Sequence, residues 1–455
     1  MNKINKTLLG LTAIAIAVGC GNGEDNTHQE ENKVTTPAFD LSQIDSTVMP
    51  CEDFEKYAVG NWLNDNPVPE AESRWGSFNI VHDANEIKLR AIVESAVSAK
   101  GEKGSALQQV GDFYASALDS NTTNELGITP IQPLLDKIDG AANVQDLVET
   151  MAETRKRGSG SMFSGYVGVD SKNSSQYIMH LSQGGLGLPD KSYYTPSDER
   201  GENILNEYKK HIAALFVLAG KEQAAADEIA LQVVEIESEL ALNSMDRVQR
   251  RNPELTYNKL SMDELQELCG AINWPSFFAA AELKGVDNVV VGQLDFMKAL
   301  NGSLTKFPIE NWKTYMKWHL INDMAGNLSE AFEKQSFSFY ATTLRGTKVM
   351  KPRWKRALSK SNGNVGEQIG KLFVEKHFPE ESKQKVLDLI GNINTVFKER
   401  VQKLEWMGED TKAKAMEKLS KFTYKIGYPD KWEDYSSVDI SANTLAQNVM
   451  NMNYF

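Results

Sequence analysis

Apolar residues recur along most of the chain at the spacing of an amphipathic helix. One such stripe comprises Ile229, Val233, Ile236 and Leu240. A later stripe comprises Val386, Ile390, Ile393, Phe397 and Val401. Steps of three and four residues place all members of a stripe on one face of a helix. We therefore predict two helices, each packing its apolar face on a core.

A different pattern between residues 165 and 182 predicts a β-hairpin. Two β-rich runs, residues 166–169 and 176–181, flank the polar residues 170–175. A glycine-rich connection over residues 184–190 follows. A phosphate-binding loop is the alternative there, but neither Gly-Lys-Ser/Thr nor the GxGxxG spacing is present, so a structural turn is predicted.

The N-terminus has the pattern of an export signal. Lys3 and Lys6 precede an apolar run over residues 8–19, which is shorter than the roughly 20 residues that a membrane-spanning helix needs. Ala17-Val18-Gly19-Cys20 is typical of a bacterial lipobox, with Ala17 where leucine is more usual. We predict a lipoprotein signal peptide over residues 1–19 and acylation of Cys20; a plain secretory signal with an incidental cysteine is the alternative.

These features predict an exported protein, lipid-anchored to the bacterial cell envelope at the periplasmic or surface face of the outer membrane. Residues 20–45, polar for most of their length, are predicted to form a flexible tether between the anchor and the folded part.

Composition indicates a globular protein with more than one core. With 455 residues, 41% of them hydrophobic and 24% charged, the chain is long enough for two domains. A boundary is predicted near Arg250-Arg251-Asn252-Pro253, because proline disfavours helical geometry at the residue before it. The net charge of −13, without a basic cluster, argues against nucleic acid as a partner.

The sequence shows no catalytic constellation. No two of its six histidines are four residues apart, so the His-Glu-x-x-His zinc motif is absent. His82 and Glu86 are spaced for one helical face, but such pairs are common on solvated helices, and we do not predict a metal site there. Neither a Gly-x-Ser-x-Gly elbow nor an activated thiolate is indicated, and pairing of Cys51 with Cys269 stays open. We assign no catalytic, metal or substrate-binding residue.

Several longer motifs, in order, resemble the neprilysin family of zinc metalloendopeptidases. Residues 50–63 read PCEDFEKYAVGNWL and are followed by PVP at 67–69 and SRWGSF at 73–78. Further similar segments are GLPDKSYY at 187–194, RRNPE at 250–254, TYN at 256–258, PRWKR at 352–356, GKLFVEKHFP at 370–379, WM at 406–407, TK at 411–412, Ala415, KL at 418–419 and IGYPD at 426–430. The resemblance extends from about residue 46 to about residue 432.

This resemblance implies a mainly α, two-lobed helical architecture with a small β-hairpin and an incomplete catalytic lobe. It implies that residues 46–250 form the N-terminal part of the catalytic-lobe-like domain and residues 251–455 a helical covering-lobe-like domain. Trp62 and Arg74 are expected as buried anchors, Pro189 and Asp190 as a turn, and Trp354 as core packing. In some relatives the cysteine equivalent to Cys51 pairs with one near the C-terminus.

Complete family members bind zinc through His-Glu-x-x-His and a later Glu-x-x-x-Asp, and this sequence contains neither at the matching place. The resemblance therefore implies the N-terminal region of a secreted peptidase that hydrolyses short peptides, truncated before the zinc motif and completed by the missing C-terminal catalytic segment. A non-catalytic peptide-binding or scaffold lipoprotein is the alternative. A helical glycan-binding surface lipoprotein is a third class, which the ordered motifs disfavour. We expect poor solubility of the chain alone, because uncovered apolar surface aggregates.

Overall fold

The computed structural model describes residues 40–455. The predicted signal peptide, Cys20 and most of the predicted tether lie outside the described residues. The chain divides into two compact units, one ending at Pro67 and one spanning Val68–Phe455. The division predicted near residue 250 stays a prediction.

The described part of the first unit is a short helical segment. It contains the 3-10 helix η1 (Leu41–Gln43) and helix α1 (Phe54–Asp65). Asp53 caps α1 by accepting a hydrogen bond from the Lys56 backbone N–H at 2.9 Å. The Asn61 side chain donates to the Ile44 carbonyl oxygen at 2.7 Å, which ties α1 to the residues before it.

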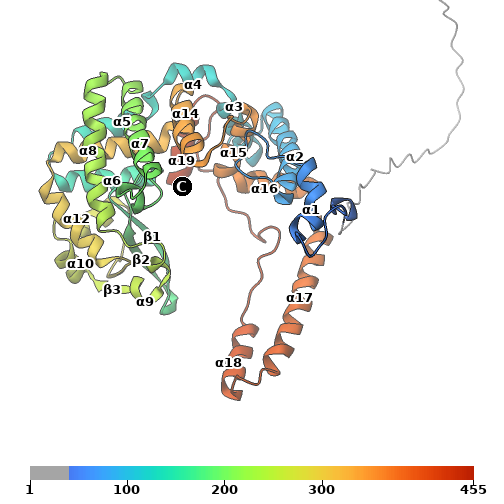
Figure 1. The fold of residues 1–455 in the computed structure, drawn as a ribbon. Helices are drawn as coiled ribbons and strands as arrows, with labels where there is room; N and C mark the ends of the chain where they lie inside the picture. Colours follow the sequence, from blue (N-terminus) through green and yellow to red (C-terminus); the bar gives the residue numbers. More distant parts are fainter. Residues whose placement is uncertain (1–39) are drawn as a thin grey trace, which may run out of the picture. The chain divides into compact units, whose positions relative to one another are not determined.

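The second unit consists mostly of helices, as the mainly α prediction requires (Figure 1). Its first helices are α2 (Ser77–Ala99), α3 (Ala106–Leu118), α4 (Ser120–Leu126), η2 (Thr129–Ile131), α5 (Gln132–Asp139), α6 (Val144–Lys156), η3 (Lys191–Tyr194), α7 (Glu199–Leu218), α8 (Gln223–Leu242), η4 (Gln249–Arg251), α9 (Pro253–Thr256), α10 (Met262–Leu268) and α11 (Trp274–Ala280). The later ones are α12 (Leu294–Lys306), α13 (Ile309–Met324), η5 (Ala325–Asn327), α14 (Glu330–Ser336), the π-helical η6 (Phe337–Thr343), α15 (Arg353–Asn364), α16 (Gly366–His377), α17 (Glu380–Gln402), α18 (Glu409–Ser420) and α19 (Leu445–Tyr454).

The predicted hairpin is confirmed and belongs to a four-stranded sheet. The strands are β1 (Phe163–Asp170), β2 (Asn173–Gln183), β3 (Asn258–Ser261) and β4 (Asn288–Val291), in the order β1-β2-β4-β3. β1 and β2 are antiparallel, with Tyr166 opposite His180; β2 and β4 are parallel, with His180 beside Val290. β3 closes the other edge antiparallel to β4. The sheet thus joins strands that are far apart in the sequence.

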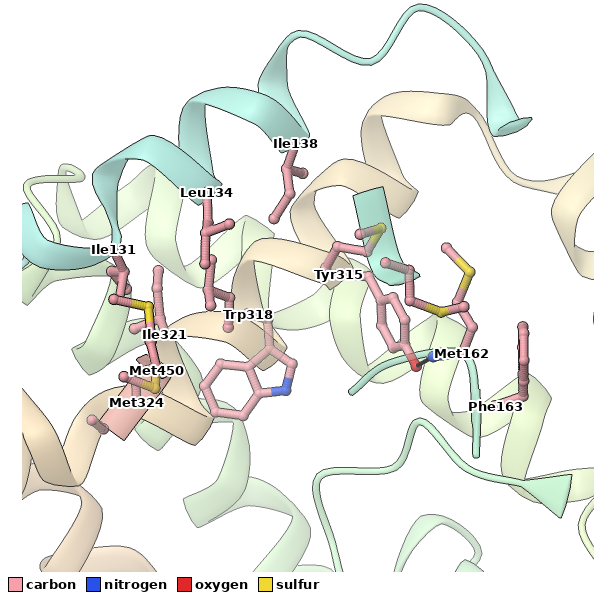
Figure 2. Close-up of a cluster of buried hydrophobic side chains, with 14 of the residues drawn as sticks. Ile131, Leu134, Ile138, Met162, Phe163, Tyr315, Trp318, Ile321, Met324 and Met450 are labelled. Carbon is pink, nitrogen blue, oxygen red and sulfur yellow. Dashed lines mark hydrogen bonds between the residues drawn. The ribbon is translucent and has the colours of Figure 1, made fainter. Parts of the chain in front are cut away.

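Helix α13 lies inside the core of the second unit. Trp318 of α13 and Tyr315, one turn earlier, are fully buried, and Leu134 of α5 lies beside this helix in Figure 2. Met450 of α19 also joins this cluster, so the last helix of the chain packs into the same core. Burial on several sides explains why α13 has no clear apolar stripe in the sequence.

The two predicted apolar stripes have different outcomes. On α8, Val233, Ile236 and Leu240 are buried, which confirms a core-facing helix. The second stripe is helical, as predicted, but the expectation that it faces a core is wrong: Ile393 and Phe397 of α17 are exposed. Within the described residues α17 packs against α18, and the buried residue of α17 is Val401, near its end.

No helix among residues 40–455 is long and apolar enough to cross a membrane.

Candidate functional site

A fully buried carboxylate, Glu237 of α8, organises the centre of the second unit. Its oxygens accept hydrogen bonds from Tyr194 Oη at 2.7 Å and Tyr208 Oη at 2.8 Å. Trp318 Nε1 and the Gly187 backbone N–H donate at 3.2 and 3.1 Å. Burial and the nearby Glu237 charge raise the pKa of both tyrosines well above the usual value. These groups are donors that hold a buried charge.

This centre locks the glycine-rich segment 184–190 in place. Tyr315 Oη donates to the Gly185 carbonyl oxygen at 2.7 Å, and Tyr340 Oη donates to that of Gly187 at 3.1 Å. Gly185 has φ of +75°, where an L side chain is strained. The segment is therefore a structural turn, as predicted, and its backbone groups are occupied by side chains of the core.

The predicted turn at Pro189 and Asp190 is also confirmed. Asp190 caps η3 by accepting from the Ser192 backbone N–H at 3.1 Å. Its other oxygen accepts from Arg247 Nε at 2.9 Å.

A hollow of about 470 Å³ lies over one face of the sheet. Tyr166, His180 and Val290 form a row across its floor, on three adjacent strands. The Tyr166 and His180 rings are stacked, 4.8 Å between centroids and 7° between planes. Arg250 and Tyr257 line its wall. They belong to residues 250–254 and 256–258, two of the segments that resemble the neprilysin family.

The lining of the hollow carries a cation without a carboxylate partner. Its lining contains no aspartate or glutamate, and the Arg250 guanidinium makes no ion pair with any residue in the described part of the chain. Asp170, next to the lining residue Val169, is held by Tyr257 Oη at 2.8 Å and Lys259 Nζ at 3.1 Å. The Lys172 backbone N–H and these side chains lower the pKa of Asp170 to about 2. An unpaired cation beside an aromatic platform favours anionic or planar groups.

The pair His82 and Glu86 does not form a metal site. His82 Nε2 lies 3.4 Å from Glu86 Oε1, but Lys355 Nζ lies 2.8 Å from the other Glu86 oxygen and also pairs with Asp83. Across residues 40–455, no three His, Cys, Asp or Glu side chains are grouped to hold a metal ion. The zinc ion that the resemblance implies therefore does not fit the described residues, and we assign it no ligand here.

Cys51 and Cys269 are both free thiols. Cys51 is exposed, whereas Cys269 is fully buried, and burial raises the pKa of the Cys269 thiol to about 12. A thiol with this pKa stays protonated and unreactive at neutral pH. Cys269 is thus not a nucleophile in the folded protein.

Of the remaining motif residues, Trp354 lies where the sequence predicts. It packs partly buried against the core, with the Arg90 guanidinium 4.6 Å from its ring centroid. Trp62 is half-buried in the first unit. The expectation of a buried anchor is wrong for Arg74, which is exposed in the segment before α2 and has no ion-pair partner among residues 40–455.

Comparison with known proteins gives consistent matches. The model of peptidase family M13 matches residues 50–429. Endothelin-converting enzyme 1 of Cavia porcellus is 31% identical over 412 residues, covering 88% of this chain and 54% of that protein. Neprilysin-3 of Drosophila melanogaster is 30% identical over 438 residues, covering 90% and 55%. The chain spans about half the length of the curated relatives it matches.

Comparison with solved structures gives the same result as the sequence matches. The zinc metalloprotease Zmp1 of Mycobacterium tuberculosis, in complex with an inhibitor, superposes with a TM-score of 0.84 at 33% identity, over 91% of this chain and 63% of Zmp1. PepO of Lactobacillus rhamnosis, at 20% identity and a TM-score of 0.76 over 87% and 63%, shows the shared fold. The ordered motifs, the family match over residues 50–429 and the Zmp1 fold together establish that this chain belongs to peptidase family M13, the neprilysin family of zinc metallopeptidases.

Proposed function

We propose that this chain acts in proteolysis, as the N-terminal half of an M13 zinc metallopeptidase that hydrolyses short peptides. The observation that carries the proposal is the continuous family match over residues 50–429, which includes nearly all of the described chain. Because the described residues do not fit a zinc ion, the metal and its ligands would come from polypeptide corresponding to the rest of the family fold. When bound, zinc would polarise the water that attacks the peptide bond.

In this proposal the described chain supplies the frame and part of the peptide-contacting surface. Residues 46–250 would contribute to the catalytic lobe and residues 251–455 would form most of the covering lobe. The hollow beside Arg250 offers a cation and an aromatic platform that suit a peptide carboxylate or an aromatic side chain. Cys20 would carry the lipid that holds the protein at the cell envelope.

The first test is to read the coding strand immediately downstream of the Phe455 codon in all three frames. A frame that encodes His-Glu-x-x-His followed by Glu-x-x-x-Asp supports the peptidase. An unrelated gene after a clean stop codon contradicts it, and favours the non-catalytic peptide-binding lipoprotein instead.

Two biochemical tests follow. The purified 455-residue chain alone should not cleave a quenched fluorescent peptide with zinc present, and adding the downstream-encoded segment should restore cleavage. For the anchor, wild-type protein should label with palmitate and sediment with membranes, whereas Cys20→Ala should do neither. Membrane association that survives Cys20→Ala contradicts the lipid anchor but leaves the peptidase proposal intact.

A further inference from the structure

Helices α3 and α16, together with the segment 432–436, line a recess of about 280 Å³. The two helices pack against each other and lie side by side in Figure 1. Two glutamines form the buried part of the lining: Gln109 of α3 is 1% exposed and Gln368 of α16 is 5% exposed. The recess shares no residue with the hollow over the sheet or with the Glu237 centre.

The hydrogen bonds of these two amides leave one buried acceptor unused. Gln109 Nε2 donates to the carbonyl oxygens of Tyr435 at 2.6 Å and Val438 at 3.0 Å. Because backbone carbonyl oxygens only accept, the Gln109 amide cannot be turned around, and its oxygen remains the acceptor for Gln368. Gln368 Nε2 donates to Gln109 Oε1 at 3.3 Å, and Gln368 Oε1 has no hydrogen-bond partner among residues 40–455. The recess therefore lacks a donor.

The charge of the lining indicates what kind of donor fits. Buried polar groups in folded proteins are almost always paired, so an unpaired one points to a bound ligand, ion or water. Glu367, Glu433 and Asp434 contribute three carboxylates to the lining, against the single ammonium group of Lys371. A donor that also carries positive charge is favoured in such surroundings, because hydrogen bonds between charged groups are the stronger ones.

Two aromatic side chains, Trp432 and Tyr435, complete the lining. The Trp432 ring is stacked on Tyr428, 6.2 Å between centroids and 7° between planes. Tyr435 Oη donates to Glu367 Oε2 at 3.1 Å, and the Glu433 backbone N–H donates to Glu367 Oε1 at 2.8 Å. The face of a tryptophan ring attracts ammonium and guanidinium groups. These contacts hold the ring and one carboxylate in place before a ligand binds, which lowers the entropic cost of binding.

We propose that this recess binds the protonated side chain of a basic residue, arginine or lysine, of a peptide. The guanidinium or ammonium group donates to Gln368 Oε1, and its charge is held by the carboxylates and the Trp432 ring. The volume lies just below the range of about 300–1,000 Å³ that encloses whole small ligands, so the recess takes the head of one side chain. The inference goes beyond the proposed function, because it requires neither zinc nor cleavage.

Isothermal titration calorimetry of the full 455-residue chain tests this with small probes. N-acetylarginine amide and N-acetyllysine amide carry the charged heads, and N-acetylcitrulline amide has the shape of the arginine probe without its charge. We expect saturable binding of the basic probes and roughly tenfold weaker binding of the citrulline probe than of the arginine probe. Equal affinities for the arginine and citrulline probes, or no binding of either basic probe, overturn the proposal.

Three substitutions assign the binding to the recess. Gln368→Leu removes the unpaired acceptor and should weaken binding of the arginine probe about tenfold. Glu433→Gln removes one carboxylate and should weaken it about threefold, whereas Lys371→Met removes a competing cation and should tighten it by about the same factor. Glu375→Gln and Lys376→Met are exposed changes on α16 outside the lining, and these matched controls should leave the affinity unchanged.

The variants keep the outcomes distinct. Circular dichroism checks the fold of Gln368→Leu, and if that variant does not fold, the exposed positions Glu433 and Lys371 still carry the test. Unchanged affinity in Glu433→Gln and Lys371→Met places the probe elsewhere and overturns the site. If the free diamine putrescine binds more tightly than both basic probes, the site takes free amines and the peptide source is wrong. The downstream reading frame tests the peptidase independently of all these results.

Discussion

Tyr208 Oη donates a hydrogen bond of 2.8 Å to Glu237 Oε2, and both side chains are completely buried. A carboxylate at this depth is tolerated because four groups donate to it from α7, α13, η3 and the glycine-rich segment. One side chain of α8 thereby fixes the positions of four segments that are not adjacent in the sequence.

Glu237→Ala should therefore be severely destabilising. It leaves several buried donors without an acceptor, at about 1–3 kcal/mol each, and we expect a loss of roughly 4 kcal/mol in the free energy of unfolding. Tyr208→Phe removes one donor from a carboxylate that keeps three others, and should cost about 1 kcal/mol. Chemical denaturation followed by circular dichroism measures both. Glu235→Ala, an exposed glutamate on the same helix, is the matched control and should change stability by less than about 0.5 kcal/mol. Equal losses for Glu237→Ala and Glu235→Ala would show that the network contributes nothing.

Stability should fall in mild acid because of His211. This ring is buried, stacked on Phe339, and bonded to Asn322 Oδ1 and Gln335 Nε2 at 3.2 Å each. Burial lowers the pKa of His211 from 6.5 to about 4. The unfolded chain therefore takes up a proton near pH 6.5 that the folded chain excludes until about pH 4, so stability is full above pH 6.5 and is lost as pH falls through this window. The loss is on the order of 3 kcal/mol.

The measurement is the denaturation midpoint at several pH values from 7.5 to 4.5. His211→Gln removes the titrating group, so the difference between wild type and variant should shrink steadily as the pH falls. His377→Gln replaces an exposed histidine outside the core and is the control for the substitution itself. A His211→Gln curve parallel to the wild type would mean that other groups cause the acid sensitivity.

Alanine substitutions at two glycines with positive φ should distinguish the cost of backbone strain from the cost of steric crowding. Gly185 (φ +75°) and Gly220 (φ +91°) both disfavour a side chain, but an added Cβ at Gly185 would lie 2.8 Å from the Met162 nitrogen, whereas the space around Gly220 is open. Gly220→Ala should cost about 1 kcal/mol, from the left-handed conformation alone. Gly185→Ala adds crowding and should cost about 3 kcal/mol. Thermal or chemical unfolding of both variants tests this, and similar costs would contradict the close packing of the segment 184–190.

Elements with a strong local signal were predictable. The α8 stripe, the α17 helix and the β1–β2 hairpin follow from periods of 3.6 and 2 residues that are visible in a short window. β3 and β4 were not predicted, because each has four residues and is defined by its pairing with a distant strand. Periodicity also reports which side of a helix is apolar, not whether a partner is present, and this is why the core-facing expectation failed for α17.

The candidate site was less predictable than the fold. The spacing of His82 and Glu86 correctly indicated that the two side chains are neighbours. The ion pair of Lys355 with Glu86 could not be inferred from local spacing, because Lys355, which also donates a hydrogen bond to Asp83, lies 272 residues after Asp83 in the sequence. The hollow beside Arg250 is built from three strands and a separate segment, so no short motif encodes it. Its one visible signal was the segment 250–253, which we interpreted as a domain boundary and as part of the family resemblance. The exposure of Arg74 likewise depends on tertiary surroundings.

The two free cysteines of the described chain should react with iodoacetamide at very different rates. Cys51 is exposed and should be alkylated within minutes at pH 8, whereas Cys269 is buried with a pKa of about 12 and should react only when its surroundings unfold. Peptide mass spectrometry after labelling, with and without urea, assigns each thiol separately and keeps Cys20 apart from both. Cys269→Ala, a smaller apolar residue in a fully buried place, serves as the control for assignment and should lower stability by about 1–2 kcal/mol. Rapid labelling of Cys269 in the absence of urea would show that the surrounding core opens readily in the isolated chain. If Cys51 is labelled only after a reductant is added, Cys51 forms a disulfide.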